Sequence, residues 1–365
     1  MQLGIIGLPA AGKTTIFNAL TGRNQATGAL AGGGHLEVHT AVVDVPDPRL
    51  EALADLFHPR KTVYAKVTYI DIGGVARGGR GDTGPEAPRE SLPGPLLNQL
   101  TQLDGFVQVV RAFEDPNVPH PSDSVDPRRD LSALQTEFLL NDMVVVERRM
   151  TRLSEERQRG GRDKPAIDRE IALFQRVSEC LGSEQPLRTL DLSSEEQRTL
   201  SGFGLLTLKP ILIVVNLAEG QPAPDVGPAP PGAAILALQG KLEMEIAQLS
   251  PEETPTFLAE YGIQEPGLKR VIRASYDLLG LQSFFTVGED EVRAWRLRRG
   301  GTALEAAATV HTDLARGFIR AEVIAWDELV ALGGLIEARA KGKLRLEGKD
   351  YVVAEGEIVH IRFNV

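Results

Sequence analysis

A glycine-rich run near the N-terminus has the residue types and spacing of a phosphate-binding loop. Residues 7–14 read Gly-Leu-Pro-Ala-Ala-Gly-Lys-Thr and match the pattern GxxxxGK(S/T) in full. The glycines let the backbone wrap a phosphate, and N–H groups at the start of the following helix point at the anion. Lys13 supplies a cation for the β- and γ-phosphates, and Thr14 offers a hydroxyl to Mg²⁺. The nucleotide contacts predicted here are Leu8, Pro9, Ala10, Ala11, Gly12, Lys13, Thr14 and Thr15.

A second motif lies at the end of a later apolar strand. The sequence Tyr-Ile-Asp-Ile-Gly-Gly at residues 69–74 is followed by Val75. We expect Asp71 to hold the Mg²⁺ shell together with Thr14, and the Gly74 N–H to meet the γ-phosphate. A glutamine at the position of Val75 would orient the attacking water, which valine cannot do. Intrinsic hydrolysis is therefore expected to be slow or to use another group.

The turn Asn216-Leu217-Ala218-Glu219 directly follows the apolar strand 211–215 and is predicted to face the base. Switch GTPases carry Asn-Lys-x-Asp at this place, where the aspartate accepts two guanine N–H groups. Here Leu217 replaces the lysine, and Glu219 is one methylene longer than the aspartate. The longer side chain favours a base other than guanine, while Asn216 offers both a donor and an acceptor to a base edge. On these residues alone the identity of the base stays open.

Other reactive side chains give weaker indications. His35 and His39 are four residues apart, but their glycine-rich and β-branched surroundings argue against a helix and a shared metal site. His120 has no nearby Cys or His partner, so we expect a surface or packing role. Cys180 has no base beside it, which argues against a catalytic thiol.

Length and composition restrict the classes to which these motifs can belong. The 365 residues suggest two or three domains at about 100–200 residues each. Hydrophobic residues make up 42% and charged residues 25%, which excludes wholesale disorder and fibrous classes. The net charge of −10 argues against a surface that is basic throughout. Because the chain has a single cysteine, no export signal and no apolar run of about 20 residues, we expect a cytoplasmic protein with no membrane partner.

Apolar and β-branched runs predict the elements that must position these motifs. Strands are predicted at 2–6, 38–45, 63–70, 106–110 and 211–215. Loops are predicted at 73–95 and 221–231, which are rich in Gly and Pro. Helices are predicted at 14–20, 241–249 and 266–279, and Ser193 with Glu196 forms a capping box that opens another. Short strands are predicted from residue 282 onward, at 292–297, 318–323, 344–346, 350–353 and 358–363.

Two successive stretches predict a pair of antiparallel helices. The first has coiled-coil spacing at Leu139, Met143, Val146, Met150 and Leu153. The second repeats apolar residues at Ile167, Ile171, Phe174, Val177 and Leu181. The Gly160-Gly161 pair between them predicts a hairpin turn. Such an arm fits either a solvated helical insertion or a contact with a large partner.

The C-terminal module differs from the rest of the chain in charge. Residues 281–365 hold 12 Lys/Arg and 13 Asp/Glu, a balance of −1, so −9 of the net charge lies elsewhere. Basic residues cluster at 293–299 and at 339–349. These clusters fit either a solvated charged face or contacts with RNA phosphates. The acidic total therefore does not exclude an RNA partner.

The motifs, in this order, resemble the Obg-like ATPases, the YchF family of P-loop proteins. Further similar stretches are residues 45–50, 113–115, 124–127, 216–219, 284–286, 291–295, 317–324, 342–353 and 362–365. The resemblance implies an α/β fold, in which a Ras-like nucleotide-binding domain is interrupted by an antiparallel coiled-coil hairpin and followed by a β-grasp (TGS) domain. The implied parts are a nucleotide-binding domain at 1–130 and 193–280, the hairpin at 131–192 and the TGS domain at 281–365.

The resemblance also implies a function. Family members prefer ATP to GTP, hydrolyse it slowly and associate with ribosomes. Their hydrophobic residue in place of the catalytic glutamine corresponds to Val75. For this chain the implied ligands are Mg²⁺ and ATP (or GTP), and the implied partner is the ribosome or ribosomal RNA through the TGS domain and hairpin. No DNA partner is expected.

The chain departs from the family pattern around the phosphate site. The family has asparagine where Ala10 stands, and the threonine of its first switch falls on His35. The glycine-rich stretch at 78–84 is altered, and the base-contacting Ser-Ala turn has become Gln239-Gly240. Because the phosphate cradle is made by backbone and is intact, we expect binding to survive better than hydrolysis.

Three functions follow as alternatives. The leading one is an ATP-binding switch with weak or no hydrolysis that engages the ribosome. A GTP-dependent translation GTPase has the same fold. A pseudo-NTPase scaffold, in which nucleotide is structural or absent, belongs to another class.

Overall fold

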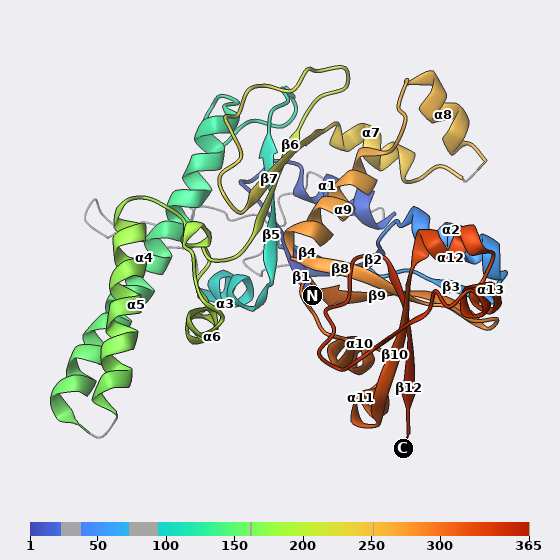
Figure 1. Ribbon diagram of the computed structural model, residues 1–365. Helices are drawn as coiled ribbons and strands as arrows, with labels where there is room; N and C mark the ends of the chain where they lie inside the picture. Colours follow the sequence, from blue (N-terminus) through green and yellow to red (C-terminus); the bar gives the residue numbers. More distant parts are fainter. Residues whose placement is uncertain (23–37, 73–93, 161–162, 251, 365) are drawn as a thin grey trace, which may run out of the picture. The chain divides into compact units, whose positions relative to one another are not determined.

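The computed structural model describes residues 1–22, 38–72, 94–160, 163–250 and 252–364. The chain divides into two compact units (Figure 1). The first unit comprises Met1–Ala41 and Thr68–Leu268, and the second comprises Val42–Val67 and Lys269–Val365. The second unit therefore includes a segment from the N-terminal part of the chain and residues 269–280. The predicted division at residue 281 placed both in the nucleotide-binding domain. The positions 35, 74, 75 and 161 named above lie outside the described residues.

The first unit is built on a six-stranded sheet within the described ranges, in the order β2-β4-β1-β5-β6-β7. Its strands are β1 (Gln2–Ile6), β2 (Val38–Asp44), β4 (Lys66–Ile72), β5 (Gly105–Arg111), β6 (Ile211–Asn216) and β7 (Ala233–Leu238). From β4 to β7 neighbouring strands are parallel. Parallel strands are buried on both faces, and accordingly every residue of β5 and β6 is buried. The carboxyl ends of these strands lie at one edge of the sheet, where ligands bind in such folds.

Helices connect these strands or follow the last of them. They are α1 (Lys13–Thr21), α3 (Gly94–Gln102), α4 (Pro127–Arg159), α5 (Lys164–Gly182), η1 (Leu187–Thr189), α6 (Ser194–Ser201), α7 (Gly240–Ile246) and α8 (Thr254–Glu260). The capping box of Ser193 and Glu196 at the start of α6 is confirmed. A core cluster joins the sheet to α3 and α4 through Phe106, Leu100 and Phe138.

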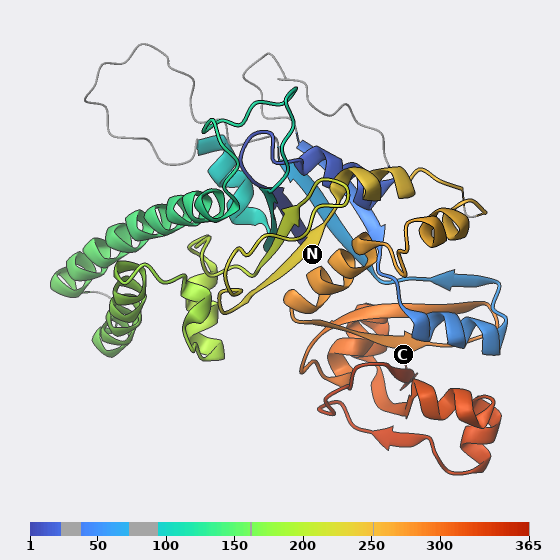
Figure 2. The same ribbon diagram turned by 90° about the horizontal axis from the view of Figure 1, so that it is seen from above.

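Helices α4 and α5 lie side by side (Figure 2) and pack through a shared apolar cluster. Arg149 of α4 forms an ion pair of 2.6 Å with Glu170 of α5. Four of the five predicted residues on α5 are fully buried, and Ile171 is partly buried. On α4 the prediction for Met143 is wrong, since its side chain is 43% exposed, because the helix turns that residue away from α5.

The second unit also contains a six-stranded sheet in its described part, in the order β11-β10-β12-β8-β9-β3. Its strands are β3 (Lys61–Val63), β8 (Leu281–Thr286), β9 (Glu291–Arg298), β10 (Phe318–Ala325), β11 (Arg345–Glu347) and β12 (Glu357–Phe363). Its helices are α2 (Pro48–Phe57), α9 (Gly267–Leu278, which begins in the first unit), α10 (Ala303–Val310), α11 (Thr312–Arg316), α12 (Trp326–Leu332) and α13 (Leu335–Ala340). The edge strand β3 pairs in parallel with β9, so an N-terminal segment completes the C-terminal sheet.

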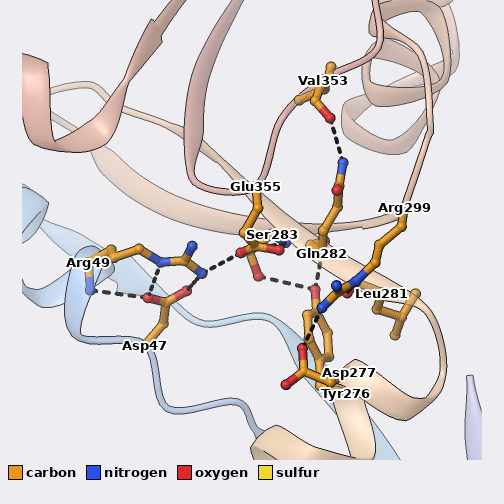
Figure 3. Close-up of polar contacts among 10 residues, drawn as sticks. All are labelled: Asp47, Arg49, Tyr276, Asp277, Leu281, Gln282, Ser283, Arg299, Val353 and Glu355. Carbon is orange, nitrogen blue, oxygen red and sulfur yellow. Dashed lines mark hydrogen bonds and ion pairs between the residues drawn. The ribbon is translucent and has the colours of Figure 1, made fainter.

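Ionic contacts tie this N-terminal segment to the rest of the second unit (Figure 3). Asp47 caps α2 and accepts hydrogen bonds from the backbone N–H of Arg49 at 3.1 Å and from its Nε at 2.8 Å. The Arg49 guanidinium also forms an ion pair of 2.6 Å with Glu355 and lies 5.4 Å from the ring centroid of Phe285. Glu355 in turn accepts a hydrogen bond from the Ser283 N–H. These contacts hold α2 against β8.

Several predicted elements differ from the observed ones. The strand predicted at 63–70 is two strands, because β3 pairs with β9 in one sheet and β4 with β1 in the other. Most of the loop predicted at 73–95 lies outside the described residues, at 73–93; its end is wrong, since Pro95 lies in the first turn of α3, where proline is tolerated. The strand predicted at 350–353 is a single bridge between Val352 and Thr302. The C-terminal module was predicted as strand-rich, but it also contains α10 to α13.

Within the described ranges, none of the helices combines the length and the apolar character needed to span a bilayer.

Candidate functional site

The loop between β1 and α1 is a backbone cradle that only glycine permits at two positions. Gly7 and Gly12 have φ of 154° and 93°, in the region that favours glycine. A Cβ at Gly7 would lie 2.4 Å from the Val109 carbonyl oxygen, and one at Gly12 would lie 2.2 Å from Asn216 Nδ2. Gly12 is the N-cap of α1 and provides no capping side chain. The first amides of α1 are therefore suited to bind an anion.

Ala10 also has a left-handed backbone, with φ of 61°. An L-residue with a Cβ is strained in this region, by roughly 1–2 kcal/mol. Asparagine, which the family pattern has at this position, tolerates the left-handed region better than alanine does. The sequence showed the substitution, whereas the strain that it brings follows from the backbone.

The Lys13 side chain is buried inside the cradle. Its Nζ donates hydrogen bonds to the carbonyl oxygens of Gly7 at 3.2 Å and Leu8 at 3.0 Å. Burial lowers the pKa of Lys13 to about 8, and the nearby Asp71 carboxylate opposes this shift. A phosphate beside the ammonium group would favour its charged form, since an anion stabilises a nearby cation.

Thr14 and Asp71 meet at the predicted metal position. The pairing of β1 with β4 places Asp71 beside Ile5, just before the cradle, and the Thr14 hydroxyl donates to Asp71 Oδ2 at 3.0 Å. The Asp71 side chain is buried, and its Oδ1 has no hydrogen-bond partner in the described part of the chain. Burial raises the pKa of Asp71, while the Thr14 hydrogen bond and the charge of Lys13 act in the opposite direction. A hydroxyl and a buried carboxylate with an unused oxygen fit Mg²⁺, which prefers oxygen ligands.

Asn216 connects three loops at the edge of the sheet. Its Nδ2 donates to the Ala11 carbonyl at 3.1 Å, and its Oδ1 accepts from the Gly240 N–H at 3.0 Å. A Cβ at Gly240 would lie 2.6 Å from Asn216 Oδ1, so the small residue permits this close approach. Asn216 thus braces the phosphate cradle against the start of α7.

The neighbouring residues of the predicted base turn are placed differently. The Leu217 side chain packs in a core cluster with Val110 and Ile213, and its N–H donates to the Leu238 carbonyl. The Leu217 side chain is buried because an apolar group at a strand end is drawn into the core, and its contact with the nucleotide stays a prediction. Glu219 is exposed at the same turn.

Sequence reasoning missed a buried polar cluster next to the cradle. A small pocket lies between Leu8, Pro9 and Ala11 on one side and Gln108, Arg111, His120 and Asp130 on the other. His120 is buried rather than at the surface; its Nε2 lies 2.8 Å from Asp130 Oδ2, and its Nδ1 accepts from the Ser122 N–H at 3.1 Å. Because Nδ1 accepts, the proton sits on Nε2 and is donated to Asp130. No local pattern links residues 108–130 to the cradle, because the fold alone brings them together.

Comparison with known proteins agrees with this geometry. A family model described as "50S ribosome-binding GTPase" matches residues 2–146, and the model YchF-GTPase_C, described as "Protein of unknown function (DUF933)", matches residues 281–364. The Ribosome-binding ATPase YchF of Bacillus subtilis is 41% identical over 375 residues, with all of both chains covered. The protein of the same name from Haemophilus ducreyi is 38% identical over 373 residues, with 100% of this chain and 99% of the relative covered.

A solved structure described as the Schizosaccharomyces pombe YchF GTPase matches the fold. It has a TM-score of 0.83 and 30% sequence identity, and the match covers 99% of this chain and 97% of that chain. Similarity of this extent includes both units and the phosphate cradle. The chain therefore belongs to the YchF family of Obg-like P-loop proteins.

Proposed function

We propose that the chain is a P-loop nucleotide-binding protein that prefers ATP, hydrolyses it slowly and associates with the ribosome. The observation that carries the proposal is the pairing of Thr14 with the buried Asp71 directly beside the glycine cradle. Relatives at 41% and 38% identity are named ribosome-binding ATPases, which supports the same activity here.

The residues of the cradle have different roles in binding the triphosphate and in its hydrolysis. The amides at the start of α1 bind phosphate oxygens, and Lys13 neutralises the charge that develops on the transferred phosphoryl group. Thr14 and Asp71 would hold Mg²⁺, which would neutralise part of the charge on the phosphates. The predicted contact of the Gly74 N–H with the γ-phosphate remains part of this proposal.

The nature of the base separates the two nucleotide alternatives. Glu219 stands where guanine recognition needs an aspartate, and its longer side chain favours ATP. GTP is the second candidate, because the matching family model and the solved structure are both described as GTPases. Asn216 remains a proposed base contact. The contacts described above use one N–H of its Nδ2 and one lone pair of its Oδ1, and its amide has a second of each.

We further propose that the chain consists of a nucleotide-binding domain at 1–130 and 193–280, a coiled-coil hairpin at 131–192 and a TGS domain of β-grasp type at 281–365. The packing of α4 on α5 supports the hairpin, and the core cluster that joins the C-terminal sheet to α10 supports the third part. In this proposal the hairpin and the TGS domain contact the ribosome or its RNA, which places the protein in the cytoplasm.

Calorimetry on the purified protein with Mg²⁺ tests the proposal. We expect ATP to bind more tightly than GTP and binding to be lost in Lys13→Ala. GTP binding at least tenfold tighter than ATP would overturn the preference for adenine. A Lys13→Ala variant that still binds ribosomes, together with a wild-type melting temperature that excess nucleotide does not change, would support the pseudo-NTPase scaffold instead.

A further inference from the structure

The turn that follows β6 is fastened to the end of β5 by one side chain. Gln221 Oε1 accepts a hydrogen bond from the Ala218 N–H at 2.9 Å, and its Nε2 donates to the Ala112 carbonyl at 2.7 Å. The backbone adds a second link, because the Ala112 N–H donates to the Asn216 carbonyl at 2.9 Å. The Gln221 amide therefore fixes the distance between the turn and the segment that begins at Ala112.

The segment 112–118 is held from its other side by Arg111. The Arg111 side chain is fully buried, and its Nε and Nη2 donate to the carbonyl oxygens of Phe113 at 3.0 Å and Val118 at 2.8 Å. Its guanidinium lies 4.6 Å from the ring centroid of Phe113. The segment thus curls around a buried cation, and Gln221 joins this segment to the 216–221 turn.

The strand order indicates on which side of the cradle the nucleoside of a bound nucleotide would lie. Asp71 ends β4, on one side of β1 and the cradle, whereas β5 and β6 lie on the other side of β1. A triphosphate whose metal-bound end is near Asp71 must extend its nucleoside toward the ends of β5 and β6. The two segments that Gln221 joins, 112–118 and 216–221, are the loops that follow those strand ends.

We propose that Gln221 is a positioning residue for the nucleoside half of the nucleotide. It holds the 216–221 turn at the spacing from segment 112–118 that a purine needs, and it takes no part in holding the phosphates. This role rests on the proposed function, since it requires that the cradle binds a nucleoside triphosphate. It adds a residue that lies outside the Asn216–Glu219 motif.

The test compares two ligands, ATP and inorganic tripolyphosphate, each with Mg²⁺. Gln221→Met keeps the volume of the side chain and removes both hydrogen bonds, whereas Gln221→Glu keeps the acceptor for the Ala218 N–H. We expect Gln221→Met to weaken ATP binding about 5- to 20-fold and tripolyphosphate binding less than about twofold, as the loss of two hydrogen bonds on the nucleoside side predicts. We expect a smaller loss of ATP affinity in Gln221→Glu.

A matched control is Gln197→Met on α6, where Gln197 Nε2 donates to the Leu192 carbonyl at 3.1 Å. This variant removes a similar bond on a helix that is part of neither the cradle nor the 216–221 turn, and it is expected to bind both ligands as the wild type does. Equal loss of ATP and tripolyphosphate binding in Gln221→Met, or loss of neither, would overturn the positioning role. Wild-type protein that binds no ATP, whether or not it binds tripolyphosphate, would overturn the proposed function and this role with it, whereas wild-type ATP binding with an equal or absent effect of Gln221→Met would overturn this role alone.

Discussion

The Thr14 hydroxyl donates a hydrogen bond of 3.0 Å to one oxygen of Asp71, while the other oxygen of this buried carboxylate has no partner among the described residues. The two residues are 57 positions apart and end up adjacent because β1 pairs with β4. The Thr14 hydroxyl satisfies the hydrogen bonding of one carboxylate oxygen. The other oxygen is buried without a hydrogen bond from the described residues. A bound cation would stabilise such a carboxylate, which the protein alone leaves with one unpartnered oxygen among the described residues.

Replacing Asp71 by asparagine should raise the stability of the protein and weaken its binding of Mg²⁺. Burial raises the pKa of Asp71, so its ionised form is disfavoured in the folded state. Stability is therefore lost as the pH rises from the ordinary value through the raised pKa, and the loss persists at neutral pH. Asp71→Asn keeps an acceptor for Thr14 and should raise the free energy of unfolding in the absence of Mg²⁺. It should also weaken Mg²⁺-dependent nucleotide binding.

Urea unfolding and calorimetry measure the two effects. Asp142 on α4 provides the contrast, because this buried carboxylate accepts hydrogen bonds from the N–H groups of Leu206 and Thr207 at 2.9 and 2.7 Å. Asp142→Asn keeps an acceptor for only one of these N–H groups and turns a donor toward the other, so it should be destabilised by about 1–3 kcal/mol. A destabilised Asp71→Asn variant with unchanged Mg²⁺ dependence would contradict our assignment.

Nucleotide binding should take up protons near pH 8. Burial lowers the pKa of Lys13 to about 8, so about half of the molecules carry a neutral lysine there. The lowered pKa makes the folded state bind fewer protons than the unfolded state between pH 8 and the ordinary value of 10.5, so stability rises with pH across that interval. A bound triphosphate raises the pKa again and recharges the amine.

Calorimetry in buffers with different ionisation enthalpies measures this uptake. We expect a fraction of one proton per nucleotide at pH 8 and almost none at pH 6. Lys209 also has a pKa lowered to about 8 by burial, but it donates to carbonyl oxygens at the C-terminal end of α3 and not to the cradle. Lys209→Met should therefore leave the uptake in place, and uptake that vanishes in this variant would refute the role of Lys13.

Ala10→Gly should stabilise the protein. Ala10 has φ of 61°, and glycine removes the strain of a Cβ in this region. After the greater flexibility of glycine in the unfolded chain is counted, we expect a gain of about 0.5–1 kcal/mol in urea unfolding. Ala11→Gly is the control, since Ala11 is buried and has no positive φ, and it should lose about 1 kcal/mol. Similar losses in both variants would show that strain at Ala10 is absent.

Ribosome association should depend on basic residues that the fold leaves without partners. Much of the predicted basic clusters is ion-paired, as with Arg299 and Asp277 or Arg345 and Glu357. Arg298, Lys341 and Lys349 are exposed, and none of them forms an ion pair in the described structure. Replacing each by alanine should reduce the slope of log affinity against log salt by about 1.

Pelleting with ribosomes at several salt concentrations gives this slope. Arg316 is a matched control because it is exposed and its charge is shared with Asp313 at 3.5 Å. We expect Arg316→Ala to leave the slope unchanged. Equal slopes for wild type and the triple variant would place the ribosome contact away from these residues.

The sequence predicts the cradle well because its chemistry is local. Gly7, Gly12, Lys13 and Thr14 lie within eight positions, and an apolar strand and a helix flank them. Asp71 could also be assigned, because it ends a run that reads as a strand. The capping box of Thr302 and Glu305 at the start of α10 was an equally local signal and was overlooked.

Contacts made across the fold could not be predicted in this way. Nothing near Asn216 in the sequence shows that its amide bonds Ala11 and Gly240, which are 205 and 24 positions away. Arg111 reads as the polar end of an apolar strand, yet it is fully buried because the following segment wraps around it. The division of 61–72 between two sheets depends on partners far along the chain, and its composition is uniform.

The placement of β3 in the C-terminal sheet has a consequence for how such proteins can be rearranged. A gene fragment that begins at residue 269 encodes five of the six strands of that sheet and lacks the edge strand at Lys61–Val63. A single crossover therefore cannot transfer this unit whole to another protein, as it can for a domain whose residues are contiguous. Recombination between genes should therefore transfer both units together or leave both in place.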